Sequence, residues 1–205
     1  MEKKTKEMKK WKEDADDEVK ILKDNGEKVV ASVPNQDLQF TARLNDLVVT
    51  TIIDAFVRKR RANSKVVLEA AEQFGRRVFE ECMEKREKWT PYEWVVGCIT
   101  KIFNRQGTGV TFTIPSNGEV MAIIHKCPTP ERARISPEVA CAFSWGYVRG
   151  LWRAAFPDGE VVMKGTMAMG YPTCGFVLKE KASAKDKKHV KEIKDILHKM
   201  AEPKV

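Results

Sequence analysis

The chain has 205 residues, of which 42% are hydrophobic, enough for one folded domain with a core of ordinary size. No apolar run approaches the roughly 20 residues that cross a bilayer, and the charged start MEKKTKEMKK lacks the apolar stretch of a signal peptide. The formal net charge is +8, but half of this excess lies in residues 179–205, which carry nine lysines and five acidic residues. We therefore expect a cytoplasmic protein with no membrane segment, and the charge distribution argues against a nucleic-acid partner.

Residues 1–28 are predicted to form a charged helical arm. Apolar side chains recur in steps of three and four over residues 5–24, at Met8, Trp11, Ala15, Val19 and Leu22, which is the spacing of one helical stripe. Such an arm either docks its stripe on the body of the protein or binds a partner helix. The second alternative would allow a homo-oligomer through the arm.

Residues 29–180 are predicted to form a single α+β domain that begins with helices. A short strand at 29–33 precedes a long helix that Asn35 can cap, and Ser64 can cap the next helix. The sequence Thr90-Pro91-Tyr92-Glu93 combines a capping threonine, a proline at the first helical position and a glutamate at the third. This combination is a strong signal for a helix start.

Beyond residue 107 the apolar period changes from 3.6 to 2, which indicates strands. The turn signal Pro115-Ser116-Asn117-Gly118 separates the first two strands. The pattern predicts an antiparallel sheet in the order β-β-α-β-β, followed by a lysine-rich C-terminal helix within 181–205. The expected elements are strands 110–114 and 119–126, helix 137–156, and strands 161–169 and 174–178.

His125 and Cys127 form the first candidate site. Residues i and i+2 of a strand share a face, so the imidazole would lie beside the thiol. A neighbouring cation lowers a thiol pKa and produces the nucleophilic thiolate, which makes Cys127 a candidate nucleophile and His125 a candidate proton shuttle. The alternative is simple burial, since free cysteine is among the most buried residue types.

Cys141 marks a second candidate site, near the start of the helix 137–156. Trp145 and Trp152 share its face by helical spacing, and the small residues Gly146 and Gly150 could leave room for a ligand beside the tryptophans. Close packing of this helix is the alternative interpretation.

The five cysteines also raise the question of a metal. Cys127, Cys141 and Cys174 with His125 would suit zinc, which accepts three thiolates and one imidazole, and iron is a second candidate. The spacing offers no C-x-x-C pair, so the sequence alone does not establish that these residues converge. Cys82 and Cys98 fall within helical stripes and are assigned to packing.

The block Gly165-Thr-Met-Ala-Met-Gly-Tyr-Pro-Thr-Cys-Gly-Phe176 resembles the closing motif T-x-A-x-G-x-x-x-C-x-F of the L-2-amino-thiazoline-4-carboxylic acid hydrolase family. Cys127-Pro128 and Cys141 resemble the C-P and the following cysteine of the same family. The block is also similar to the 4-vinyl reductase domain, a small-molecule-binding module of bacterial sensors. The similarity covers roughly the second half of the domain.

The hydrolase resemblance implies opening of a thiazoline-type ring by attack at its C=N carbon. Cys127 or Cys141 would be the nucleophile, with Thr166 and Cys174 lining the pocket beside Trp145 and Trp152. The hydrolases commonly carry an acidic residue where this chain has Gly175.

The vinyl reductase resemblance implies a non-catalytic domain that binds an apolar ligand. Members of that group can hold zinc through a helix cysteine, a glutamate, a second cysteine and the final cysteine. Cys141 and Cys174 match the first and last of these, but Met163 and Thr166 stand at the other two positions.

Overall fold

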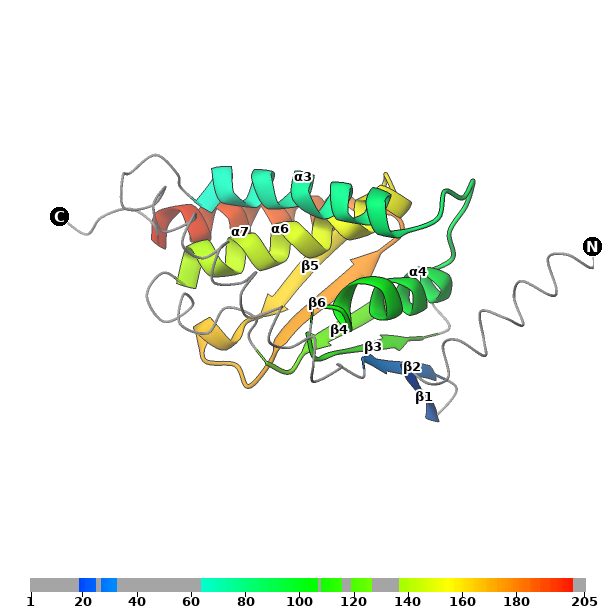
Figure 1. Cartoon of the computed structure of the whole chain (residues 1–205). Helices are drawn as coiled ribbons and strands as arrows, with labels where there is room; N and C mark the ends of the chain where they lie inside the picture. Colours follow the sequence, from blue (N-terminus) through cyan, green and yellow to red (C-terminus); the bar gives the residue numbers. More distant parts are fainter. Residues whose placement is uncertain are drawn as a thin grey trace, which may run out of the picture.

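The structure is a computed structural model that describes residues 19–24, 27–32, 64–106, 108–115, 119–126 and 137–200. These residues form an α+β fold, as the sequence predicts: one antiparallel sheet with helices against one face (Figure 1). The long helix predicted after Asn35 lies outside the described residues. Within the described part of the chain, no helix is both long and apolar enough to span a membrane.

The sheet has six strands in the order β1-β2-β3-β4-β6-β5, and every neighbouring pair is antiparallel. The connection through α6 and β5 places β6 between β4 and β5, so β6 pairs with both of them. The strands are β1 (Val19–Asp24), β2 (Glu27–Ser32), β3 (Val110–Ile114), β4 (Val120–Ile124), β5 (Glu160–Gly165) and β6 (Cys174–Lys179).

The helices lie on one side of this sheet, with α3 over α6 and with α7 alongside (Figure 1). Alternate side chains of a strand point to the same face, and on β3 the buried ones are Val110 and Phe112. The ring of Phe112 contacts the Trp94 ring of α4 edge-on, with 5.9 Å between the ring centroids. The helices are α3 (Ser64–Cys82), α4 (Pro91–Cys98) with a π-helical continuation at Ile99–Phe103, α6 (Pro137–Ala155) and α7 (Ala184–Met200).

The predicted start of α4 is confirmed. The Thr90 side chain accepts a hydrogen bond from the Glu93 backbone N–H, and the Glu93 carboxylate accepts one from the Thr90 backbone N–H. This reciprocal box satisfies two of the donors that every helix leaves free at its first turn.

Two predicted elements differ from the structure. Residues 19–24, expected within the helical arm, form β1, which pairs with β2 through partners such as Ile21 and Val30. Pairing with the neighbouring strand therefore outweighs the weak helical stripe of these residues. The strand expected over 161–169 ends at Gly165, and Met167–Met169 form a 3-10 turn.

Helices α3 and α6 pack at unusually close range because glycines lie at their contact. A Cβ on Gly146 or Gly150 would collide with backbone carbonyls of α3, and a Cβ on Gly75 would collide with the carbonyl of Tyr147. Helix α3 therefore fills the small-residue groove of α6. This agrees with the interpretation that the glycines allow close packing of the helix.

A buried ion network ties α3, α6 and β5 together. The Arg149 guanidinium binds both carboxylate oxygens of Glu160, at 2.5 and 2.9 Å, and also pairs with Glu72. Burial opposes the charge of Arg149, but hydrogen bonds and attraction from the two carboxylates outweigh it, so the pKa of Arg149 is raised. Arg153 binds the second oxygen of Glu72 at 2.8 Å.

Candidate functional site

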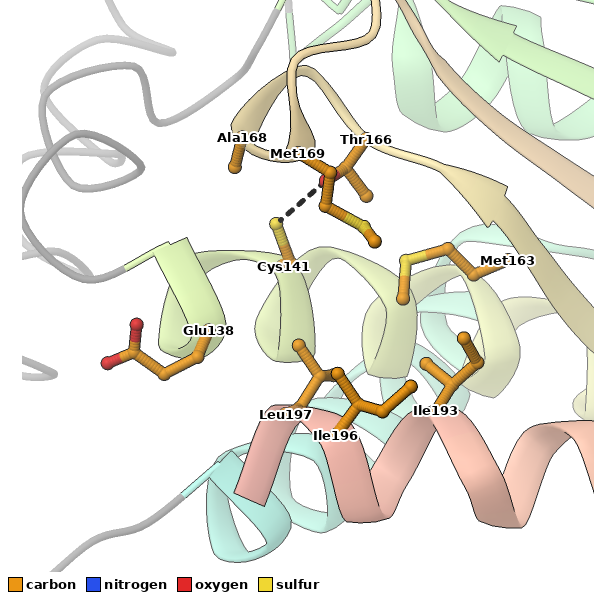
Figure 2. Close-up of a pocket in the computed structure, with 9 residues that line it drawn as sticks. All are labelled: Glu138, Cys141, Met163, Thr166, Ala168, Met169, Ile193, Ile196 and Leu197. Carbon is orange, nitrogen blue, oxygen red and sulfur yellow. Dashed lines mark hydrogen bonds between the residues drawn. The ribbon is translucent and has the colours of Figure 1, made fainter. Parts of the chain in front are cut away.

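A small pocket lies where the first turns of α6 approach the end of β5 and the second half of α7 (Figure 2). Its cavity volume is about 20 Å³, room for about one water molecule. Six of its nine lining residues are apolar, and the other three are Glu138, Cys141 and Thr166. The apolar ones are Met163, Ala168, Met169, Ile193, Ile196 and Leu197.

The mouth of this pocket is apolar and partly open to solvent. Met169 is 51% exposed and Ile196 is 46% exposed, although side chains of this kind are usually buried. Figure 2 shows the Met169 side chain extending from the 3-10 turn toward the space above Cys141 and α7. Methionine is unbranched and flexible, and here its thioether side chain forms part of the exposed apolar rim of the pocket.

The pocket lining contains one thiol, that of Cys141. Its sulfur donates a hydrogen bond to the Thr166 hydroxyl, with 3.5 Å between Sγ and Oγ1 (Figure 2). Thr166 is only 2% exposed and stands directly after β5, so the strand end holds the hydroxyl in a fixed place. Two residues 25 positions apart are thus brought together in one wall of the pocket.

The remaining residues of the T-x-A-x-G-x-x-x-C-x-F block build the turn that carries Thr166. Gly170 has φ +89°, a conformation that side chains other than glycine rarely adopt, and it ends the 3-10 turn. The Cys174 sulfur accepts a hydrogen bond from the Met167 backbone N–H at 3.4 Å. Phe176 is buried in the core.

Cys141 and Cys174 therefore contact neighbouring residues of one segment, Thr166 and Met167. Only Cys141 lines the pocket. Cys174 fixes the turn by accepting from its backbone, so within this structure it acts on the pocket through the position of Thr166.

Trp145 and Trp152 are fully buried in the hydrophobic core rather than in the pocket wall. The Trp145 indole N–H donates to the Val161 carbonyl and that of Trp152 to the Lys179 carbonyl, each at 2.8 Å. Both indoles thus join α6 to the sheet at β5 and at the end of β6. The packing interpretation fits this geometry better than a ligand between the tryptophans and the sheet.

His125 lies on the other face of the sheet. Its ring nitrogen Nε2 is 2.7 Å from the Thr111 hydroxyl, and Thr111 alternates with Val110 and Phe112, whose side chains face the helices. The structure therefore separates this imidazole from Cys141. Cys127 lies outside the described residues.

No group of three or more histidine, cysteine, aspartate or glutamate side chains able to hold a metal occurs among the described residues. Cys141 and Cys174 are the members of the predicted zinc or iron set that this part of the chain places near one segment. Cys98 is fully buried, and burial raises its pKa, as expected for a packing thiol. Cys82 is exposed, so its assignment to packing is wrong.

Several pocket residues were not predicted as site residues from the sequence. Glu138 lies three residues before Cys141, on the same side of α6, and this spacing could have drawn attention to it. Ile193, Ile196 and Leu197 of α7 gave no signal beyond an ordinary helical pattern, because their convergence with Met163 and Met169 depends on tertiary packing.

Comparison with known proteins finds no relative of this chain. No protein-family model matches the chain, and no curated protein or solved structure matches it at a significant level.

Proposed function

We propose that this chain handles a small molecule in the Cys141 pocket and acts as a hydrolase on a compact ring containing sulfur and nitrogen, of the thiazoline type. One observation carries the proposal: the contact between the Cys141 thiol and the Thr166 hydroxyl within the pocket. This contact joins two of the residues that carry the hydrolase resemblance, the helix cysteine and the first residue of the T-x-A-x-G-x-x-x-C-x-F block.

The proposed reaction uses Cys141 as nucleophile. Its sulfur would form a bond to the C=N carbon of the ring while the thiol proton passes to the ring nitrogen. Water would then displace Sγ from this carbon, forming a C–O bond and returning a proton to the Cys141 thiol. The adduct would open by breaking its ring C–S bond, and the hydroxyl proton would pass to the leaving ring sulfur as a carbonyl forms. The Thr166 hydroxyl, which accepts a hydrogen bond from the thiol in the free protein, would then donate a hydrogen bond to the substrate.

Non-catalytic binding is the second candidate function. It is favoured by the mainly apolar lining and by the position of His125, which lies on the opposite sheet face and does not supply a base to Cys141. Pockets of this composition bind apolar ligands with a few polar groups to fix orientation.

The experiment compares the protein with Cys141→Ser and with Cys82→Ser, a control that removes an exposed thiol on α3. Ring opening of 2-amino-2-thiazoline would be followed by the thiol it releases, and alkylation of each cysteine by mass spectrometry. The hydrolase proposal expects turnover in the protein and in Cys82→Ser, and its loss in Cys141→Ser.

Binding without turnover, detected as protection of Cys141 from alkylation, would replace the hydrolase with the binding function. If Cys141 reacts only after unfolding and no thiazoline protects it, both functions are rejected.

A further inference from the structure

One face of the sheet has no described helix against it. The helices lie on the face that Val30, Phe112 and Ala122 share, and these three side chains are buried (Figure 1). The residues that alternate with them along the strands point to the opposite face. On β3 and β4 these residues are partly or fully exposed, and Met121 is 47% exposed. The described helices therefore leave this face open over β2, β3 and β4, and we call it the outer sheet face.

The open part of the outer sheet face consists of two rows that cross the strands. The strand register sets their members, which are Val29, Thr113 and Met121 in one row and Ala31, Thr111 and Ile123 in the other. Apart from the two threonines the members are apolar, and the Thr111 hydroxyl is already bonded to His125. Exposed apolar surface of this kind marks an interaction site.

The segment of this chain that leads into the sheet edge suits this face. β1 is the edge strand next to β2 and begins at Val19. Residues 8–18 lie outside the described residues, but their sequence places Met8, Trp11 and Ala15 at helical spacing, and every other residue among them is charged. A helix with such a pattern buries its narrow apolar side against another surface and keeps its charged sides in water.

The dimensions agree with a helix that crosses the strands. A helix rises about 1.5 Å per residue, so Ala15 and Trp11 would lie about 6 and 12 Å from Val19. Neighbouring strands are about 4.8 Å apart, which places β2 about 5 Å and β4 about 14 Å from β1. Ala15 can therefore reach the outer sheet face at β2, and Trp11 can reach it at β4, where Met121 and Ile123 lie.

Other pairings fit the positions of the elements less well. Residues 33–63 join β2 to Ser64, the first residue of α3, which lies on the helix-bearing side of the sheet. That segment therefore has to leave the outer sheet face. Exposed apolar side chains also occur on α3, at Val66 and Phe74, but Figure 1 shows α3 and β1 separated by α6 and the sheet.

We propose that residues 8–18 form a helix that docks its apolar side, Met8, Trp11 and Ala15, on the outer sheet face. The partner of this surface is then a segment of the same chain. The docking covers the two rows on β2, β3 and β4. It is independent of the Cys141 pocket, which is formed on the helix-bearing side of the sheet.

Trp11 reports the docking, because the other tryptophans of the chain are buried: Trp89, Trp94, Trp145 and Trp152. Iodide quenching of the fluorescence of the whole chain, compared with that of Trp11→Phe, isolates the signal of Trp11. Met121→Glu places a charge within the proposed docking surface. Val66→Glu is the matched control, because Val66 is 49% exposed, close to the 47% of Met121, and lies on α3.

We expect Trp11 to be protected from iodide in the unchanged protein and in Val66→Glu. In Met121→Glu its quenching should rise to the level measured in the urea-unfolded chain, while circular dichroism shows that the variant is folded. A second pair of variants lies outside the described fold and tests the docking even if Met121→Glu does not fold. Ala15→Glu should expose Trp11, whereas Lys10→Gln, with the same change in net charge but off the apolar side, should not.

Quenching of Trp11 in the unchanged protein at the level of the unfolded chain overturns the inference. Protection that survives in a folded Met121→Glu overturns it as well, and loss of protection in Val66→Glu would then assign the segment to α3. Protection that disappears on dilution, together with dissociation of a dimer in sedimentation, would identify the occupant as the same segment of a second copy and contradict docking within one chain.

Discussion

The Cys141 thiol on α6 and the Thr166 hydroxyl at the end of β5 meet at 3.5 Å. Neither element alone would place these groups together: the helix positions the sulfur, and the strand end positions its acceptor. The contact therefore shows that α6 and the end of β5 both contribute side chains to the pocket.

Replacing Thr166 by valine should lower ring opening without unfolding the protein. Valine keeps the shape of this buried side chain but removes the acceptor, so the free energy of unfolding should fall by only about 1 kcal/mol, whereas turnover should fall at least about tenfold. Thr166→Ser keeps a hydroxyl and should retain most of the activity. Full activity in Thr166→Val would show that the hydroxyl plays no part.

Trp145 is expected to support the fold and not the ligand. Trp145→Phe removes buried volume and leaves the Val161 carbonyl without its indole donor, so the free energy of unfolding should fall by about 2–3 kcal/mol. The affinity for 2-amino-2-thiazoline should stay unchanged, because the indole does not line the pocket. A large loss of affinity in a folded Trp145→Phe would restore the ligand-wall interpretation.

Gly150→Ala should destabilise the contact between α3 and α6. The added methyl would collide with backbone atoms of Glu72 and Arg76, which cannot move like a side chain, so we expect a loss of roughly 1–3 kcal/mol from overpacking. Gly175→Ala is the control, since its Cβ would lie 3.8 Å from the nearest other side chain, Lys164. Urea unfolding of both variants measures the difference.

Removing the guanidinium at the centre of the ion network should be costly. Arg149→Met leaves the carboxylates of Glu72 and Glu160 without their main partner in a buried place, and breaking such a pair costs about 3–5 kcal/mol. Arg153→Met should cost less, because its side chain is 30% exposed and Glu72 is the one carboxylate that pairs with it among the described residues. Chemical denaturation measures the free energy of unfolding of both variants. Equal losses in the two would contradict this ranking.

Asp186 should make stability depend on pH in the acid range. Burial opposes its charge, but hydrogen bonds from Ser183 and the attraction of Lys179 outweigh this and lower the pKa of Asp186 below its ordinary 3.8. A lowered pKa stabilises the folded state above the unfolded pKa, and this contribution disappears as pH falls through the folded value. Asp186→Asn should therefore be less stable than the protein at pH 7.

The measurement compares unfolding of the protein and of Asp186→Asn at pH 7 and below pH 3. The gap between the two should close at the lower pH, where the carboxyl becomes protonated. A gap that stays constant over this range would mean that shape, and not charge, explains the effect of the substitution.

Local signals in the sequence were sufficient for most elements of the second half. The Thr90–Glu93 capping box, the alternation at 110–114 and the helical stripes of α6 and α7 depend on neighbours within a few residues, and the structure has them as predicted. The same local reasoning was wrong for residues 19–24. Their partner strand, β2, rather than their own spacing, decides that they are extended.

The sequence by itself determined the α+β class and the residues of the T-x-A-x-G-x-x-x-C-x-F block, because each depends on residues that lie close together in the chain. The tertiary structure alone decided which reactive groups meet. It joined Cys141 to Thr166, placed His125 on the opposite sheet face, and sent Trp145 into the core. The reason is physical: period and capping act within one element, whereas a pocket requires the packing of α6, β5 and α7 against one another.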